Sequence, residues 1–237
     1  MKLTHDMIER NQALLIVLVI LVVSVGGLVE IVPLSFQKSV IEPVAGLKPY
    51  TAVQLTGRDI YIREGCYNCH SQMIRPFRYE TERYGEYSKP GEFVYDHPFL
   101  WGSRRIGPDL AREGGKYPDL WHIRHMEDPR SITAQSIMPK YGWLLKNTID
   151  FASIQRRVDV MAMLGVPYGD AINRAPAMAR AQAREIAEGV ASQGGPKGLE
   201  DKEIVALVAY LQRLGKDIKL AQAGTAGATG PAPTRTP

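Results

Sequence analysis

The stretch Cys66-Tyr67-Asn68-Cys69-His70 decides what this chain folds around. It contains both cysteines of the 237-residue chain, in the pattern C-x-x-C-H. Two thiols three residues apart can add to the two vinyl groups of one porphyrin, and the histidine that follows can ligate the iron. The pattern is typical of covalent c-type haem attachment. We therefore predict that Cys66 and Cys69 hold one haem c, with His70 as an axial ligand.

The residues before the motif predict the helix that presents it. Thr56-Gly57-Arg58-Asp59 fits a capping box, in which Thr56 bonds forward and Asp59 bonds back to the helix start. A helix that continues through Ile60, Tyr61 and Glu64 brings Cys66 close to its end.

Met138 is the predicted second axial ligand. It lies in Ser136-Ile137-Met138-Pro139, a loop between two predicted helices, where Pro139 stiffens the approach of the sulfur to the iron. Thioether ligation raises the reduction potential of a haem. The other methionines fit less well: Met73 is too close to His70 to reach the opposite face, and the rest precede the haem domain or lie on predicted helices, namely Met7, Met126, Met161, Met163 and Met178.

Two loop features are predicted to support the haem. In Gly107-Pro108-Asp109-Leu110, the carbonyl of Pro108 is a suitable acceptor for the second ring N–H of His70, as axial histidines require. Arg104 and Arg105 are candidates for bidentate bonds to the haem propionates. A solvated loop is the alternative for these two arginines.

The remaining histidines leave alternatives open. His122 and His125 could join Cys66 and Cys69 in a Cys₂His₂ zinc site, although this leaves His70 without a role. Either histidine could also replace Met138 and give a bis-histidine haem. A position at the surface or at the haem edge is the default for both, and for His97.

The N-terminal segment predicts a membrane anchor. Residues 13–32 contain one charge, Glu30, and form about 30 Å of helix, which just spans a bilayer. A secretory signal is the alternative, but the apolar run is longer than a typical signal core and no small-x-small cleavage site follows it. We expect Glu30 to lie at the outer membrane interface, solvated or in contact with a partner.

Helical periodicity dominates the rest of the chain, and strand patterns are nearly absent. Residues 74–118 are expected to be a long irregular region. Helices are predicted over 118–128, 147–164, the later part of 170–191, where Pro176 breaks or restarts the helix, and 201–214. The expected organisation is an all-α chain with a cytoplasmic N-terminus (1–12), an anchor (13–32), a lead-out segment (33–54), a haem domain (55–220) and a disordered tail (221–237).

Composition excludes other classes of function. The chain is 45% hydrophobic and 23% charged, which is ordinary for a globular protein. Its formal net charge of +4 is mild, and no basic run resembles a nucleic-acid-binding arm. We therefore expect no nucleic-acid partner.

Taken in order, the motifs resemble a class I cytochrome c: the C-x-x-C-H, Gly107-Pro108-Asp109-Leu110, the Met138-Pro139 loop and the apolar segment 204–211. In that fold the first and last helices cross beside the haem. With the anchor, Trp101-Gly102-Ser103, Asp128-Pro129-Arg130-Ser131 and residues 136–144, the chain looks like the mono-haem cytochrome c subunit of cbb3-type cytochrome c oxidase. The resemblance runs from about residue 5 to residue 215.

The resemblance implies a role and partners. His70 and Met138 would be the axial ligands, and Cys66 and Cys69 the covalent ones. The subunit would sit in the bacterial inner membrane with its haem domain in the periplasm. It would pass electrons from a di-haem cytochrome c subunit, or a soluble cytochrome c, to haem b of the catalytic haem–copper subunit, which reduces oxygen to water. A free membrane-anchored shuttle and a haem-based sensor are the competing expectations.

Overall fold

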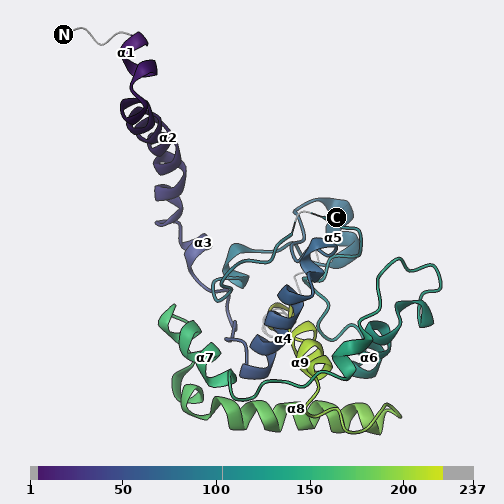
Figure 1. The fold of residues 1–237 in the computed structure, drawn as a ribbon. Helices are drawn as coiled ribbons and strands as arrows, with labels where there is room; N and C mark the ends of the chain where they lie inside the picture. The colour runs from purple at the N-terminus through teal and green to yellow at the C-terminus, as the bar shows by residue number, and fades with distance from the viewer. Residues whose placement is uncertain (1–4, 103, 221–237) are drawn as a thin grey trace, which may run out of the picture. The chain divides into compact units, whose positions relative to one another are not determined.

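The computed structural model describes residues 5–102 and 104–220, and the chain divides into two compact units. The first unit comprises Met1–Pro43 and Lys89–Val94, and the second comprises Val44–Ser88 and Tyr95–Pro237. The expected tail at 221–237 lies outside the described residues. The first unit contains α1 (His5–Arg10), α2 (Gln12–Leu34), α3 (Lys38–Ile41) and a 3₁₀ turn, η2 (Pro90–Glu92) (Figure 1).

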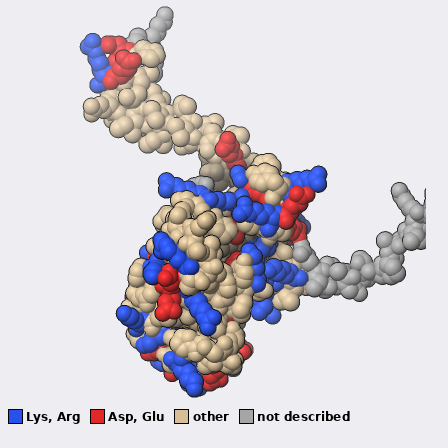
Figure 2. All heavy atoms as spheres, turned by 90° about the vertical axis from the view of Figure 1, so that its right-hand side faces the viewer, with Lys and Arg blue, Asp and Glu red and all other residues tan. Residues whose placement is uncertain are grey.

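Helix α2 is the expected apolar helix. Its 23 residues have a mean hydropathy of 2.9 over the most apolar window, and none of its side chains is buried. At 1.5 Å per residue it is about 35 Å long. The side chain of Asn11 caps its start by accepting from the N–H of Leu14, and Pro33 lies in its last turn. Figure 2 shows charged side chains gathered over α1, whereas the surface of α2 is almost entirely uncharged. Helix α2 is therefore long and apolar enough to cross a membrane.

The second unit is built around two helices, α4 (Ala52–Arg63) and α9 (Glu203–Leu211), which pack against each other. Every residue of α9 is buried. The backbones come close because Gly57 of α4 faces Ala206 of α9, and Tyr61 and Tyr210 pack beside them with ring centroids 5.4 Å apart. This helix pair forms the centre of the core.

Further helices surround this pair. Helix α8 (Ala175–Ser192) packs against α4, α7 and α9, and it buries alanines four residues apart, a spacing that keeps one narrow face towards the core. The other helices are α5 (Arg78–Tyr84), α6 (Asp119–Glu127) and α7 (Ile154–Met163). Short 3₁₀ turns link them: η1 (Cys66–Asn68), η3 (Pro129–Ser131), η4 (Gly142–Leu145) and η5 (Gly169–Arg174). No strand occurs in the described residues, which contain one isolated bridge, between Thr148 and Lys202, so the all-α prediction is confirmed.

The predicted capping box at Thr56 and Asp59 was wrong. Helix α4 begins one turn earlier, where Thr51 and Gln54 form the capping box instead. Thr56 is a buried helical residue whose hydroxyl bonds to the carbonyl of Ala52, and Asp59 pairs with Arg157. Thr51 and Thr56 both fit the sequence pattern of a capping box. The earlier threonine caps the helix, and Ala52 and Val53 are then helical residues that are buried in the core.

Two further predictions of local structure need correction. Residues 74–118 are not wholly irregular, because α5 occupies Arg78–Tyr84. Helix α7 begins at Ile154 rather than at Asn147. The carboxylate of Asp150 accepts from the N–H groups of Ala152 and Ser153 and forms a turn, while Ile149 donates to the carbonyl of Asp201. These bonds use backbone groups that a longer helix would need.

Candidate functional site

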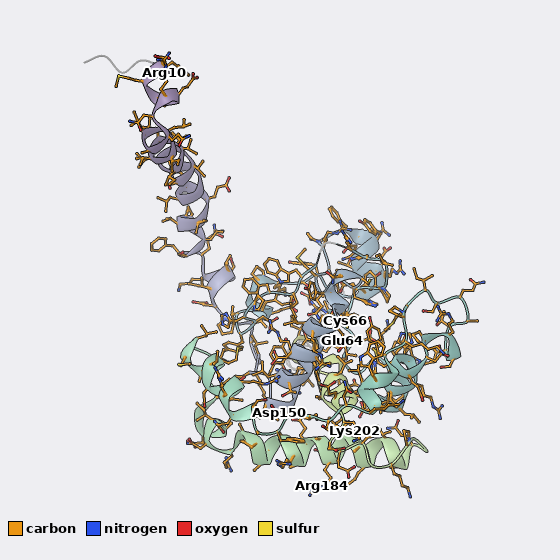
Figure 3. All side chains as sticks on the ribbon, in the orientation of Figure 1. Arg10, Glu64, Cys66, Asp150, Arg184 and Lys202 are labelled. Carbon is orange, nitrogen blue, oxygen red and sulfur yellow. The ribbon has the colours of Figure 1, made fainter. Side chains whose placement is uncertain are left out.

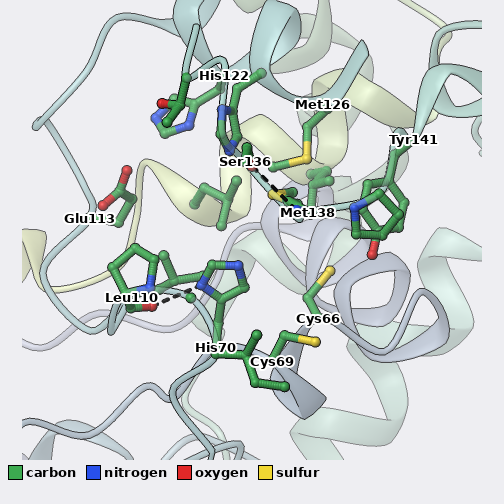
Figure 4. Close-up of a pocket in the computed structure, with 18 of the residues that line it drawn as sticks. Cys66, Cys69, His70, Leu110, Glu113, His122, Met126, Ser136, Met138 and Tyr141 are labelled. Carbon is green, nitrogen blue, oxygen red and sulfur yellow. Dashed lines mark hydrogen bonds between the residues drawn. The ribbon is translucent and has the colours of Figure 1, made fainter. Parts of the chain in front are cut away.

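The cysteine-histidine segment is presented by the end of α4 (Figure 3). Helix α4 ends at Arg63, and Gly65 then adopts a left-handed conformation with φ of 70°, which glycine tolerates best. The chain continues as η1, in which the N–H groups of Cys69 and His70 donate to the carbonyl of Cys66 over 3.1 and 2.9 Å. This tight turn places both thiols and the imidazole along one cavity wall (Figure 4).

Both cysteines are free thiols. Cys66 is buried and Cys69 is partly exposed, and no disulfide joins them. Burial raises the pKa of the Cys66 thiol to about 12, so this group is protonated at neutral pH. A protonated thiol is the reactant whose S–H bond adds across a vinyl group.

His70 is oriented by the loop 106–110, which packs against its ring. Its Nδ1 lies 2.8 Å from the carbonyl oxygen of Pro108. With Nδ1–H donated to this oxygen, Nε2 retains its lone pair and can bind a metal. Burial lowers the pKa of the imidazole, while the bond to Pro108 and the nearby Asp109 raise it. The lowered pKa favours the neutral form of the imidazole, which is the form that can bind a metal.

The absence of a side chain at Gly107 leaves space for the imidazole ring of His70. A Cβ atom built on this residue would lie 2.2 Å from Cε1 and 2.7 Å from Nδ1 of His70. Both distances are far below van der Waals contact. The loop can therefore pass behind the ring only if residue 107 is glycine.

A buried carboxylate ties the two loops together. Asp109 accepts from the hydroxyl of Ser71 over 2.6 Å and from the N–H of Met73 over 2.9 Å. Between the same loops, Gly107 donates to the carbonyl of Cys69 and Leu110 to that of Ser71. The position of Pro108 relative to His70 is consequently fixed by several bonds rather than by one.

The cavity behind these residues has a volume of about 460 Å³, within the usual range for sites that hold a small molecule or cofactor. Its walls come from the end of α4, the loop 106–110, α6, the loop 133–141 and α9. Met138 lines it from the loop 133–141, and Figure 4 shows Met138 and Met126 across the cavity from His70. The structure therefore brings Cys66, Cys69, His70, Pro108 and Met138 to one cavity.

The other methionines are less well placed. Met126 of α6 also lines the cavity and is 8% exposed. Met161 is buried in the core, Met163 and Met178 are exposed, and none of the three lines the cavity. Methionine sulfur can thus reach this cavity from two residues, Met138 in a loop and Met126 on a helix.

The two arginines do not line this cavity. Arg105 donates to the carboxylate of Glu80 over 2.7 Å and to the hydroxyl of Ser71. The bond from this guanidinium lowers the pKa of the buried Glu80 carboxyl to about 2. Arg104 is exposed. Arg105 therefore already has an anionic partner, and a contact of either arginine with a haem propionate stays a prediction.

His122 and His125 lie on α6 and both line the cavity. The described residues contain no group of three or more His, Cys, Asp or Glu that could hold a metal ion, so the structure does not assemble the alternative zinc site. His97 is exposed and lies outside the cavity.

Sequence reasoning missed several wall residues. Glu113 and Lys116, which pair over 3.8 Å, line the cavity although no motif contains them. Tyr61, Leu207 and Leu211 were expected only as helical residues, and they form apolar walls. The sequence placed Tyr61 on a helix and gave Leu207 and Leu211 an apolar helical spacing, but the packing of α4 and α9 decides which of their residues face the cavity.

The donor set fits a haem of the c type. Two free thiols, an imidazole with a defined tautomer and a thioether surround a mostly apolar cavity, and Gly107 leaves space for the ring of His70. The family described as "Cytochrome C oxidase, mono-heme subunit/FixO" has a model that matches residues 5–218. None of the curated proteins compared with the chain matches it.

Proposed function

Because the chain belongs to the family of cytochrome c oxidase mono-haem subunits of the FixO type, we propose that it is the membrane-anchored electron relay of a cbb3-type terminal oxidase. The chain receives electrons from a di-haem cytochrome c subunit or a soluble cytochrome c. It delivers them to haem b of the catalytic haem–copper subunit, where oxygen is reduced to water. It acts as a carrier and makes no bond of the oxygen chemistry itself.

Each cavity residue has a defined task in this proposal. A haem c bound here supplies one-electron exchange between ferric and ferrous iron. Cys66 and Cys69 would hold the porphyrin through thioethers, and His70 and Met138 would bind its iron. Pro108 accepts the Nδ1–H of His70, which fixes the ring and makes Nε2 a better donor. Two protein ligands close the iron to other molecules, as an electron carrier requires.

The observation that carries the proposal is the 2.8 Å contact between His70 Nδ1 and the carbonyl of Pro108, within a cavity that both cysteines and Met138 also line. The alternative zinc site of Cys66, Cys69, His122 and His125 would leave His70 and Met138 without a role. A haem-based sensor needs an open position on the iron, whereas here a methionine lies across the cavity from the histidine.

The apolar helix α2 and the chemistry of haem attachment together support a periplasmic location for the haem domain. In bacteria, c-type haem is attached outside the cytoplasmic membrane. With α2 as the membrane-spanning helix, the haem domain lies in the periplasm and the residues before α2 lie in the cytoplasm. The domain is then held beside the membrane subunit that receives its electrons.

Purification in mild detergent tests the proposal. Affinity capture of the full chain from its own membranes is expected to yield covalent haem on a denaturing gel, absorption bands of both b and c haems, and oxygen consumption. The matched control is Cys66→Ala with Cys69→Ala, which should lose the covalent haem. A captured chain that carries haem but brings no other haem protein would identify a free-standing shuttle and overturn the assignment to an oxidase.

A further inference from the structure

Two ionisable side chains of the cavity wall, Tyr61 and His122, are each 1% exposed. The hydroxyl of Tyr61 and the Nε2 atom of His122 both lack a hydrogen-bond partner among the described residues. Tyr61 lies on α4, the helix that ends beside Cys66, whereas His122 lies on α6. Tyr117 and Trp121 flank the ring of His122 edge-on, with centroids 6.2 and 5.2 Å away, so the ring has little freedom. A buried polar atom left without a partner destabilises the folded state. A partner for Nε2 is therefore expected from whatever fills the cavity.

The position of His122 within the cavity is informative. Figure 4 shows Cys66 and Cys69 on one side, and His122 and Glu113 on the other. Lys116 lies 3.8 Å from Glu113 and lines the same cavity. The side away from the cysteines is thus the one that carries ionisable groups, while the helices α4 and α9 contribute apolar walls.

The chemistry of the porphyrin matches this polarity. Its two vinyl groups lie on one edge and its two propionates on the opposite edge. A porphyrin tethered at Cys66 and Cys69 therefore directs its carboxylates towards the side of His122. We propose that His122 donates its Nε2–H to a haem propionate and so anchors the carboxylate edge of the cofactor. This inference rests on the proposed haem c and adds a positioning residue to it.

Other candidates for this role are weaker. Arg105 is engaged by Glu80 and does not line the cavity. Lys116 already faces Glu113, and its side chain is 47% exposed. His125 also has a buried ring nitrogen without a partner, Nδ1, but its ring stacks on Trp121 with centroids 4.7 Å apart, and it is less buried than His122. His122 combines full burial, a fixed ring and an unpaired nitrogen.

The proposed bond affects the iron through charge. A donor on the propionate partly offsets the negative charge near the haem, and this favours the ferrous state. Loss of the donor should therefore lower the reduction potential. Because Glu113, Lys116 and His125 also line the cavity and can titrate, the comparison is made at one fixed pH.

Redox-induced infrared difference spectroscopy of the full chain in detergent, together with potentiometry, tests the inference. His122→Leu should shift the haem carboxylate band and lower the potential. His122→Gln, which keeps an N–H donor, should restore both towards the parent values. The matched control is His125→Leu, which removes a neighbouring histidine of the same helix and should leave the carboxylate band in place.

The outcomes separate this inference from the proposed function. Covalent haem on a denaturing gel with an unchanged carboxylate band in His122→Leu would overturn the role of His122 and leave the haem assignment intact. Loss of the sulfur–iron absorption in His122→Leu would show that His122 supports the methionine ligand rather than the carboxylate edge of the haem, and would also overturn the inference. A parent chain without covalent haem would instead refute the proposed function.

A measurement on the parent chain makes the test independent of variant folding. Low-spin ferrous haem is diamagnetic, so ¹⁵N–¹H NMR of histidine-labelled protein can observe the imidazole nitrogens. We expect His122 Nε2 to carry a proton that exchanges slowly with solvent. An Nε2 that carries no proton would contradict the proposed donor.

Discussion

At the scale of single residues, Gly107 sets the space available to the axial histidine. Gly107→Ala places a Cβ 2.2 Å from Cε1 of His70, so the ring has to turn away from the carbonyl of Pro108. The expected result is a shifted reduction potential and altered haem absorption, with thioether attachment retained. Gly142→Ala is the matched control, because the nearest atom to its Cβ is 4.0 Å away. Identical spectra for both variants would contradict the steric role of residue 107.

Replacing each of the two methionines of the cavity should have a different effect on haem absorption. Met138→Leu should abolish the near-infrared charge-transfer absorption of a sulfur–iron bond and lower the reduction potential, because thioether ligation favours ferrous iron. Met126→Leu, on the same cavity, should keep the band. Absorption spectroscopy of the oxidised protein distinguishes the two cases. A band that is lost in Met126→Leu but survives in Met138→Leu would assign the ligand to α6.

The residues of the cavity differ in how far the sequence predicts them. Cys66, Cys69 and His70 are close in the chain, so their spacing alone places them on one turn. Pro108 and Met138 depend on the order of motifs along the chain, and both do line the cavity. The pairing of Arg105 with Glu80 and the burial of His122 depend on tertiary packing that local patterns do not encode.

At the scale of helices, the contact between α4 and α9 depends on one missing side chain. A Cβ on Gly57 would lie 1.8 Å from the carbonyl oxygen of Ala206, and a backbone atom cannot move aside as a side chain can. Gly57→Ala should lower the free energy of unfolding by about 3 kcal/mol. Thermal unfolding followed by circular dichroism measures the effect.

The control for this prediction lies on α8. Gly189→Ala meets no atom within 4 Å and should keep or raise stability by up to about 1 kcal/mol, because alanine favours the helix more than glycine does. Equal free energies of unfolding for the Gly57 and Gly189 variants would contradict the prediction, because they would show that the close approach of α4 and α9 contributes little to stability.

Helix positions were predicted better than helix ends. The segment of α6 follows from the prolines at its borders, that of α8 from its alanine-rich composition and Pro176, and that of α9 from its apolar periodicity, because these signals are local. The start of α4 at Ala52 and that of α7 at Ile154 depend on competition between neighbouring caps and turns. At α7, the turn of Asp150 and the bond from Ile149 to Asp201 prevail over the helical pattern.

At the scale of the whole haem domain, a buried ion pair makes stability depend on pH. Arg58 and Asp96 are 2% and 3% exposed, and their Nε and Oδ1 atoms lie 3.8 Å apart. Burial raises the pKa of the Asp96 carboxyl to about 6, although Arg58 and Tyr50 act against it. An aspartate in the unfolded chain has a pKa of about 3.9. The folded state therefore binds this proton more tightly than the unfolded state does.

The sign of the effect follows from this order of pKa values. The contribution of Asp96 to the free energy of unfolding is greatest below about pH 4, decreases between about pH 4 and 6, and is constant above that range. Asp96→Asn, which has no titrating carboxyl at this position, should remove this slope. Melting temperatures across the range measure the effect. Exposed Asp170→Asn is the control, and an unaltered slope in Asp96→Asn would assign the proton to another group.

The long apolar helix and the all-α architecture were the most predictable features at this scale. A continuous apolar run identifies α2 without any knowledge of packing, because its side chains are not buried by the rest of the chain. The boundary between the two units was harder to predict, since residues 89–94 group with the N-terminal segment although they lie far along the sequence.

The walls of the cavity also have a consequence for biogenesis. Tyr61, Leu207 and Leu211 belong to the hydrophobic core and to the cavity lining at once. With the proposed haem in the cavity, these residues would pack against the cofactor, so haem loading would add to the stability of the core. The proposed thioethers would also require both thiols to stay reduced until haem arrives, since a bond between them would block attachment. On this proposal, a cell that makes the subunit has to supply haem and reducing equivalents at the same place.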